Sequence, residues 1–262
     1  MKHIDLYKYQ GAGNDFIMVD NRDGGFPRED HDLIRRMCDR HFGVGADGLM
    51  LLCPSAEYDL DMLYYNADGR PGSMCGNGGR CMAAFARDRG YVRGNGSLHF
   101  TAVDGEHVAQ FTGDNGVRLK MRDCEEPRRV LNGYFVDSGS PHHVEYVDNL
   151  LEMDVDKAGR SLREHKAYAP GGCNVDFVRE EKNGSLSLRT FERGVEGETL
   201  ACGTGAVAAA VVQHARSARK PPYDIHMRGG TLKVYLRKRG GIFTDIWLEG
   251  PAEFVFKGEY PI

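Results

Sequence analysis

The feature that most constrains this chain is a short cysteine–glycine motif that occurs twice. Met74-Cys75-Gly76-Asn77-Gly78-Gly79 and Ala201-Cys202-Gly203-Thr204-Gly205-Ala206 are offset by 202 − 75 = 127 positions in a chain of 262 residues. Each copy follows a predicted strand and loop, and each begins a predicted helix. A repeat of nearly half the chain, with matched context on both sides, predicts two similar halves.

The pattern of apolar residues predicts what each half contains. Helical spacing occurs over 29–40, 78–89 and 205–216, and strand-like runs recur before and after each motif. The segment 206–212 is apolar nearly all round, which is typical of a helix enclosed by other elements. We therefore predict an α+β fold of two pseudo-symmetric domains. Each is a strongly curved antiparallel sheet or barrel around a central helix.

The predicted domain boundaries follow the repeat. Residues 1–115 form the half that carries Cys75, and the C-terminal strand 249–262 returns to it. Residues 116–248 form the half that carries Cys202. The chain has 34 glycines, roughly double the usual share of ~7%. They are scattered among apolar runs, as expected for many short strands joined by tight turns.

Composition and charge exclude several classes of function. A formal net charge of −4 argues against a nucleic-acid or anionic-membrane partner. The chain lacks a run of eighteen apolar residues, and its first residues lack the apolar core of a secretion signal. The seven cysteines include no Cys-X-X-Cys pair, so we predict no metal site. An odd cysteine count without a secretion signal fits a reducing cytoplasm.

A cysteine followed by glycines at a helix start has a specific chemistry. The first N–H groups of a helix lack internal partners and carry partial positive charge. That charge can lower the pKa of a cysteine from about 8.5 to roughly 3.5–7.5. The same N–H groups can hold a carboxylate, and glycines let the backbone approach it closely.

Two such helix starts that face one another would form a two-base catalyst. One thiolate removes the α-proton of an amino acid, and the opposite thiol returns a proton to the other face. The shared carboxylate gains charge in the transition state, and preorganised N–H groups stabilise that charge. No pyridoxal cofactor is then needed as an electron sink, so we predict a cofactor-independent racemase or epimerase.

The chain resembles the diaminopimelate epimerase family in segments spread over nearly its whole length. These are Gly11-Ala12-Gly13-Asn14-Asp15-Phe16, Gly43-Val44-Gly45-Ala46-Asp47-Gly48, Tyr65-Asn66-Ala67-Asp68-Gly69, the two cysteine motifs, Ser140-Pro141-His142, Asn174-Val175-Asp176-Phe177 and Glu192-Arg193-Gly194. The cysteine motifs are shared with proline racemases. The other segments make the resemblance specific to the family.

The resemblance implies the function and the site. It implies interconversion of LL- and meso-diaminopimelate in lysine and peptidoglycan precursor synthesis, with Cys75 and Cys202 as the acid–base pair in a cleft between domains. It implies that the reacting carboxylate is held by the backbone N–H groups of Gly76, Asn77, Gly203 and Thr204. It implies that the side chains of His142 and Glu192 lie near the α-amino group. It also implies that the distal pocket is shaped by Asn14, Asn66, Asn174 and Arg193.

Arg193 would hold the distal carboxylate through two parallel hydrogen bonds, a geometry that suits a guanidinium group. The resemblance also implies a tendency to form homodimers. Two positions depart from the family pattern. Ser140 stands where the family often has Asn, and Gly48 where it often has Gln. Both positions lie near substrate in the family, so they bear on substrate choice.

Other functions stay open on the sequence alone. A racemase of another amino acid, such as histidine, would use the same two cysteines, although Arg193, Asn66 and Asn174 favour a substrate with a distal carboxylate. A proline-racemase-like role would leave those residues without a partner. The phenazine-biosynthesis isomerases share the fold without this cysteine pair. A non-catalytic anion-binding or thiol-switch protein would not need both cysteines at helix starts.

Overall fold

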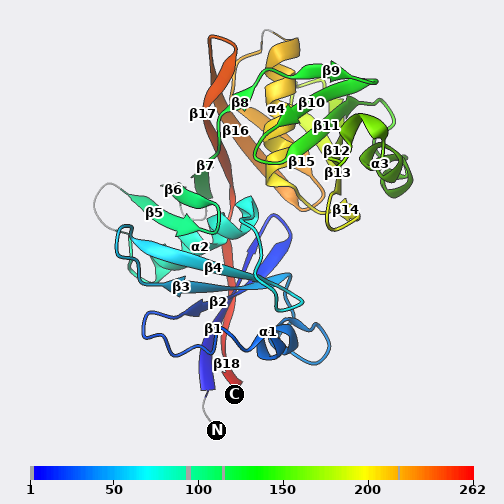
Figure 1. Ribbon diagram of the computed structural model, residues 1–262. Helices are drawn as coiled ribbons and strands as arrows, with labels where there is room; N and C mark the ends of the chain where they lie inside the picture. The colour runs from blue at the N-terminus through cyan, green and yellow to red at the C-terminus, as the bar shows by residue number, and fades with distance from the viewer. Residues whose placement is uncertain (1–2, 93–95, 114–115, 218) are drawn as a thin grey trace. The chain divides into compact units, whose positions relative to one another are not determined.

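The computed structural model describes residues 3–92, 96–113, 116–217 and 219–262. The chain divides into two compact units (Figure 1). Unit 1 comprises Met1–Leu119 and Gly250–Ile262, and unit 2 comprises Lys120–Glu249. The predicted boundary between residues 115 and 116 adjoins residues 114–115, which lie outside the described residues.

Unit 1 begins and ends with strands that pair with one another. Strand β1 (His3–Gly11) pairs in antiparallel fashion with β18 (Glu253–Pro261) and with β2 (Asn14–Asp20). The remaining elements are α1 (His31–Cys38), β3 (Gly48–Cys53), β4 (Leu60–Asn66), α2 (Gly76–Asp88), β5 (Ser97–Ala102), β6 (Gly105–Thr112) and β7 (Gly116–Lys120), the last of which ends at the unit boundary.

Unit 2 contains most of the remaining strands and two helices. In chain order its elements are β8 (Cys124–Glu125), β9 (Arg128–Val130), β10 (Gly133–Asp137), β11 (Pro141–Tyr146), α3 (Val155–Arg163), the 3₁₀ helix η1 (Lys166–Tyr168), β12 (Asn174–Glu180), β13 (Leu186–Glu192), β14 (Gly197–Thr199), α4 (Gly203–Arg216), β15 (Tyr223–Met227), β16 (Gly230–Arg239) and β17 (Ile242–Pro251).

The two units share one order of strand pairing. In unit 1, β2 and β3 are parallel across α1, β3 and β4 are antiparallel, and β4 and β5 are parallel across α2. In unit 2, β11 and β12 are parallel across α3, β12 and β13 are antiparallel, and β13 and β15 are parallel across α4. This correspondence confirms the predicted α+β fold with two similar halves.

The sheets are mixed, with antiparallel pairs predominating. Among the described strands, β2–β3, β4–β5, β11–β12 and β13–β15 are parallel. A parallel pair needs a crossover of a dozen or more residues, and a helix usually supplies it. The helices α1, α2, α3 and α4 supply these crossovers, so each cysteine motif lies on a connection between parallel strands.

Each central helix is buried inside its own unit. Helix α2 packs against β1, β2, β3 and β18, and its Phe85 ring lies 5.1 Å from the Tyr7 ring and 5.7 Å from the Tyr9 ring. Helix α4 packs against β10 to β13, β15 and β16 (Figure 1). All residues of 206–212 are fully buried, which confirms the enclosed helix predicted from their composition.

Two helix boundaries and one whole helix differ from the prediction. Helices α2 and α4 begin at Gly76 and Gly203, two residues earlier than predicted, because each cysteine takes the N-cap position with an extended backbone. Helix α3 was not predicted, because its sequence is polar and it buries only Val155 and Gly159. Among the described residues, none of the helices is long and apolar enough to cross a membrane.

Helix α3 depends on its N-cap. The Asp154 side chain accepts a hydrogen bond of 3.0 Å from the Lys157 backbone N–H. Asp154→Ala is expected to lower the free energy of unfolding by about 1 kcal/mol, the usual cost of losing such a cap. Denaturant unfolding measures the change, with Asp148→Ala at a nearby exposed position as control. Equal stability of the two variants would contradict this role of the cap.

Candidate functional site

In unit 1 the predicted catalytic cysteine lies at the start of a buried helix. Cys75 is the N-cap residue of α2, with φ −118° and ψ 127°. Its carbonyl accepts the first bond of the helix from the Gly79 N–H, at 2.8 Å. The next two residues, Gly76 and Asn77, form the first turn. Their N–H groups belong to the set that has no partner within a helix, as the proposed carboxylate site requires.

A chain of hydrogen bonds fixes the polar side chains beside Cys75. Arg80 is fully buried, and its Nη2 donates to Asn77 Oδ1 at 2.7 Å. Asn77 Nδ2 donates to Asn14 Oδ1, and Asn14 Nδ2 donates to Asp47 Oδ2 at 2.9 Å. Burial lowers the pKa of Arg80, and the nearby Cys75 and Cys81 oppose that shift. This network links two predicted substrate-binding residues, Asn14 and Asn77, to a buried cation that the sequence did not single out.

Asn66 and Gly48 lie opposite one another on β4 and β3. A Cβ at Gly72, in the loop before Cys75, would lie 3.0 Å from Asn66 Oδ1, so the amide packs closely against this loop. A Cβ at Gly48 would lie 2.4 Å from both Tyr64 Cε2 and the Tyr65 carbonyl oxygen. The backbone leaves no room for a larger residue at position 48, so Gly48 is a requirement of local packing in this chain.

In unit 2 the second cysteine occupies the matching position. Cys202 is the N-cap of α4, with φ −124° and ψ 113°, close to the values at Cys75. Its sulfur accepts a hydrogen bond from the Gly205 N–H at 3.4 Å and lies 3.4 Å from Thr204 Oγ1. Gly203 and Thr204 form the first turn. The two cysteines therefore have nearly the same backbone conformation, one in each unit, whereas only the Cys202 side chain caps its helix.

The predicted lowering of the pKa at a helix start is not what the structure shows for Cys202. Burial raises the pKa of this thiol well above its usual value, and the carboxylates of Glu192 and Asp176 raise it further. The hydrogen bond between Cys202 and the Thr204 hydroxyl, and the one that the Gly205 N–H donates to the sulfur, act in the opposite direction but are outweighed. The surroundings of Cys202 therefore favour the neutral thiol, and a nearby base would help it to become a thiolate.

His142 lies in a buried polar cluster with Cys202. Its Nδ1 is 2.6 Å from Asp176 Oδ2, and its Nε2 is 2.9 Å from Thr204 Oγ1. Both His142 and Asp176 have fully buried side chains. Thr190 Oγ1 donates to Asp176 Oδ1 at 2.7 Å. The sequence did not single out Asp176 or Thr190.

Asn174 holds the loop that carries Arg193. Its Oδ1 accepts from the Arg193 backbone N–H at 2.8 Å, and its Nδ2 donates to Ser140 Oγ at 2.9 Å. The Arg193 side chain is exposed, and its Nη2 lies 3.5 Å from Ser140 Oγ. Arg193, Asn174 and Ser140 are thus brought together, with the guanidinium available to a ligand. Ser140 contacts both predicted substrate-binding side chains.

Glu192 ends strand β13, next to Arg193. Burial raises the pKa of its carboxyl group, Asp176 adds to this, and His142 opposes it. The Glu192 carboxylate is one of the groups that raise the pKa of Cys202, so the two groups lie close enough to interact. A half-buried carboxyl group with a raised pKa beside a buried thiol is typical of acid–base sites.

The predicted residues therefore form two clusters, each within one unit. Unit 1 places Asn14, Asn66, Gly76 and Asn77 on the elements around Cys75, and unit 2 places His142, Asn174, Glu192, Arg193, Gly203 and Thr204 around Cys202. Sequence reasoning missed Arg80, Asp47, Asp176 and Thr190. One sequence feature could have identified Asp176: it lies two residues after Asn174 on a strand, so both side chains face the same side.

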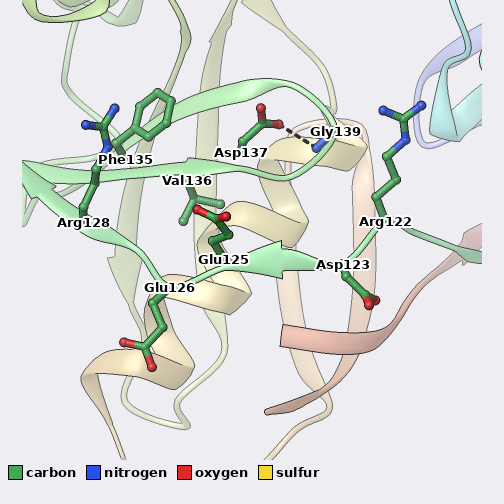
Figure 2. Close-up of a pocket in the computed structure, with 9 residues that line it drawn as sticks. All are labelled: Arg122, Asp123, Glu125, Glu126, Arg128, Phe135, Val136, Asp137 and Gly139. Carbon is green, nitrogen blue, oxygen red and sulfur yellow. Dashed lines mark hydrogen bonds between the residues drawn. The ribbon is translucent and has the colours of Figure 1, made fainter. Parts of the chain in front are cut away.

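Two pockets lie apart from these clusters. The first, of about 440 Å³, is lined by charged residues of β8 to β10 and the loops beside them (Figure 2). In it Asp137 accepts a hydrogen bond of 3.0 Å from the Gly139 N–H. The second, of about 420 Å³, lies between β1, β2 and Arg89 in unit 1. Neither pocket includes a predicted site residue, and within the described ranges no cluster of His, Cys, Asp and Glu could hold a metal ion.

Comparison with known proteins gives a consistent result across the chain. The family model described as "Diaminopimelate epimerase" matches residues 6–124 and 134–255. The diaminopimelate epimerase of Flavobacterium psychrophilum is 46% identical over 255 residues, covering 97% of this chain and 99% of that protein. That of Chlorobaculum tepidum is 44% identical over 256 residues, covering 95% and 98%.

Solved structures show the same fold at low identity. A phenazine biosynthesis protein of the PhzF family from Bacillus anthracis has a TM-score of 0.77 at 17% identity and covers 100% of both chains. A hydroxyproline epimerase from Agrobacterium vitis has a TM-score of 0.66 at 16% identity and covers 98% of this chain and 92% of that one. The paired cysteine helix starts, the two similar units and the full-length match together lead to one conclusion: the chain belongs to the diaminopimelate epimerase family.

Proposed function

We propose that this protein is a diaminopimelate epimerase, an isomerase that interconverts LL- and meso-diaminopimelate in the synthesis of lysine and of peptidoglycan precursors. The observation that carries this function is the pair of matching cysteine N-caps, Cys75 and Cys202, in a chain that matches that family over residues 6–124 and 134–255. One cysteine acts as base and the other as acid, and their roles exchange in the reverse reaction.

The reacting carboxylate is held by the helix starts. The N–H groups of Gly76 and Asn77 in one unit, and of Gly203 and Thr204 in the other, are the donors we assign to it. These donors stabilise the charge that moves onto the carboxylate when the α-proton leaves. The electron sink is then the substrate carboxylate itself, and we assign no cofactor to the reaction.

The distal end of the substrate is recognised by a second group of side chains. Arg193 offers an exposed guanidinium to the distal carboxylate, and Asn174 fixes the backbone that carries it. Asn14 and Asn66 supply neutral donors and acceptors. His142 and Glu192 act beside the reacting α-amino group and Cys202. We place the enzyme in the cytoplasm, because an odd number of cysteines is typical of proteins from a reducing compartment.

A substrate panel tests this function. Purified protein without pyridoxal phosphate is incubated with LL-diaminopimelate, L-histidine, L-lysine and L-proline, and inversion is followed by chiral chromatography. We expect inversion of diaminopimelate far above that of the other three. Faster inversion of histidine would support the racemase of another amino acid. Inversion of none of the four, in protein shown to be folded, would support a thiol protein without catalysis.

A further inference from the structure

The carboxylate of Asp176 lies beside Cys202 and His142 but has no part in the proposed function as described. Asp176 is fully buried on β12, where Thr190 Oγ1 donates to one of its oxygens and His142 Nδ1 contacts the other at 2.6 Å. A Cβ at Gly205 would lie only 2.6 Å from Asp176 Oδ1, so the first turn of α4 packs directly on the carboxylate. A charged group in such a place is costly unless its hydrogen bonds serve it well.

Neighbouring groups decide which nitrogen of His142 carries the proton. The Arg193 backbone N–H can only donate, so the Asn174 atom that receives it, at 2.8 Å, is the oxygen. The other end of that amide is then the NH₂ group, which lies 2.9 Å from Ser140 Oγ, 3.3 Å from the Pro141 carbonyl oxygen and 3.2 Å from His142 Nε2. An NH₂ group can only donate, so a second donor on Nε2 would face it unfavourably, and Nε2 presents its lone pair. The proton of the neutral ring is therefore on Nδ1, donated to Asp176.

The lone pair on Nε2 also sets the direction of the hydrogen bonds that link His142, Thr204 and Cys202. Because Nε2 is an acceptor, the Thr204 hydroxyl donates to it across 2.9 Å. The lone pairs of Thr204 Oγ1 then face Cys202 Sγ at 3.4 Å and accept the thiol hydrogen. The Gly205 N–H donates to the sulfur from the other side. The order is thus Cys202 S–H to Thr204 O–H to His142 Nε2, with His142 Nδ1–H to Asp176.

We propose that Asp176 is a positioning residue that holds His142 in the Nδ1–H tautomer, so that a relay through the Thr204 hydroxyl can carry the proton of Cys202. In the relay the thiol proton passes to Thr204 Oγ1 while the hydroxyl proton passes to His142 Nε2. The products are a Cys202 thiolate and an imidazolium paired with Asp176. No proton is gained or lost, and the reverse transfer restores the thiol.

The relay explains how the Cys202 thiol can lose its proton although its surroundings disfavour the thiolate. Cys202 is buried beside the acidic groups Glu192 and Asp176, which disfavour its ionisation. The relay places a positive charge on His142 when the thiolate forms, between that thiolate and the Asp176 carboxylate. Glu192 also lies beside Cys202, but no hydrogen bond of the relay passes through its carboxyl group.

The test combines a spectroscopic and a kinetic measurement on Asp176→Asn. The Asn side chain has the same size, and its oxygen can still accept from Thr190. When that oxygen accepts from Thr190, the NH₂ group donates to His142 Nδ1 and the ring proton moves to Nε2. Nitrogen-15 NMR of histidine-labelled protein distinguishes the tautomers, and a His142→Gln variant identifies the His142 signals among the ten histidines. We expect Nδ1–H in the wild type and Nε2–H in Asp176→Asn.

The kinetic expectation rests on the proposed function. A wrong tautomer behind a nucleophile is costly in other enzymes, so we expect kcat for diaminopimelate to fall about 10²-fold or more while KM changes little. Asp224→Asn, an exposed residue on β15, gives the same change of charge and should leave both values unchanged. An Nε2–H tautomer in the wild type, or a normal kcat in Asp176→Asn, would overturn the proposal.

A second variant guards against a folding defect in the first. Thr204→Val keeps the backbone and the side-chain shape but removes the hydroxyl. We expect His142 to stay in the Nδ1–H form while kcat falls about 10-fold or more. An unchanged kcat would rule out the relay. The tautomer measurement needs no substrate, so it can fail or succeed independently of whether diaminopimelate is the substrate.

Discussion

Replacing either Cys75 or Cys202 by serine is expected to lower the rate of diaminopimelate epimerisation by about 10²–10⁴-fold, the usual contribution of a general acid or base. A serine hydroxyl has nearly the same shape as a thiol but is a far weaker acid. It can neither form the anion that removes the α-proton nor return a proton readily. Because each cysteine serves as base in one direction and acid in the other, both variants should lose the reaction in both directions.

The measurement is the initial rate of conversion of LL- to meso-diaminopimelate and of the reverse reaction. Cys53→Ser is the matched control, because Cys53 ends strand β3 and has no part in either cluster. Near-normal epimerisation in one of the two variants would contradict a scheme in which both thiols take part. Equal losses in the control would show that the change of cysteine to serine acts through stability.

Arg193→Ala is expected to raise KM for diaminopimelate by about 10–100-fold, which corresponds to the roughly 1.5–3 kcal/mol of a hydrogen bond to a charged group. The exposed guanidinium of Arg193 lies beside Ser140, and the Asn174 side chain holds its backbone in place. Loss of the guanidinium removes a bidentate partner of the distal carboxylate, whereas the reacting end of the substrate keeps its contacts.

Two controls apply to this prediction: a second arginine variant, and a substrate without a distal carboxylate. Arg237→Ala removes an exposed arginine of β16 in the same unit and should leave KM unchanged. Any slow inversion of an amino acid without a distal carboxylate should be equally slow in Arg193→Ala and in the wild type. A proportional loss with both kinds of substrate would mean that Arg193 supports the fold of the site and does not bind the distal carboxylate.

The parts of the fold that the sequence predicted well depend on local patterns. The composition of 206–212 is enough to require an enclosed helix, and the cysteine–glycine motif is enough to mark a helix start. The parallel strand pairs were missed, because which strand lies beside which is decided by contacts between distant segments. Helix α3 was missed because its apolar residues are few, although Val155, Ala158 and Leu162 lie at helical spacing, and because its N-cap Asp154 resembles a turn residue.

In the candidate site, too, features set by local sequence were predicted and features set by tertiary contacts were not. Local sequence predicted that Cys75 and Cys202 lie near helix starts, although each helix begins two residues earlier than expected and makes its cysteine the N-cap. The pKa of Cys202 was not, because the helix start is a local effect whereas burial and the carboxylates of Asp176 and Glu192 come from the tertiary structure. Arg80 is also a case of tertiary placement: an arginine on a helix is usually exposed, and only the fold shows that it is buried beside Asn77.

The central claim is that two thiols, one in each unit, exchange protons with one α-carbon. It is tested most directly by starting the reaction with LL-diaminopimelate in deuterium oxide and measuring deuterium at the α-carbon early in the reaction. With two bases, the thiol that returns the proton carries solvent deuterium, so the meso product should contain deuterium while unreacted LL substrate contains almost none. Equal early labelling of substrate and product would contradict the account, because it would mean that a single base serves both faces.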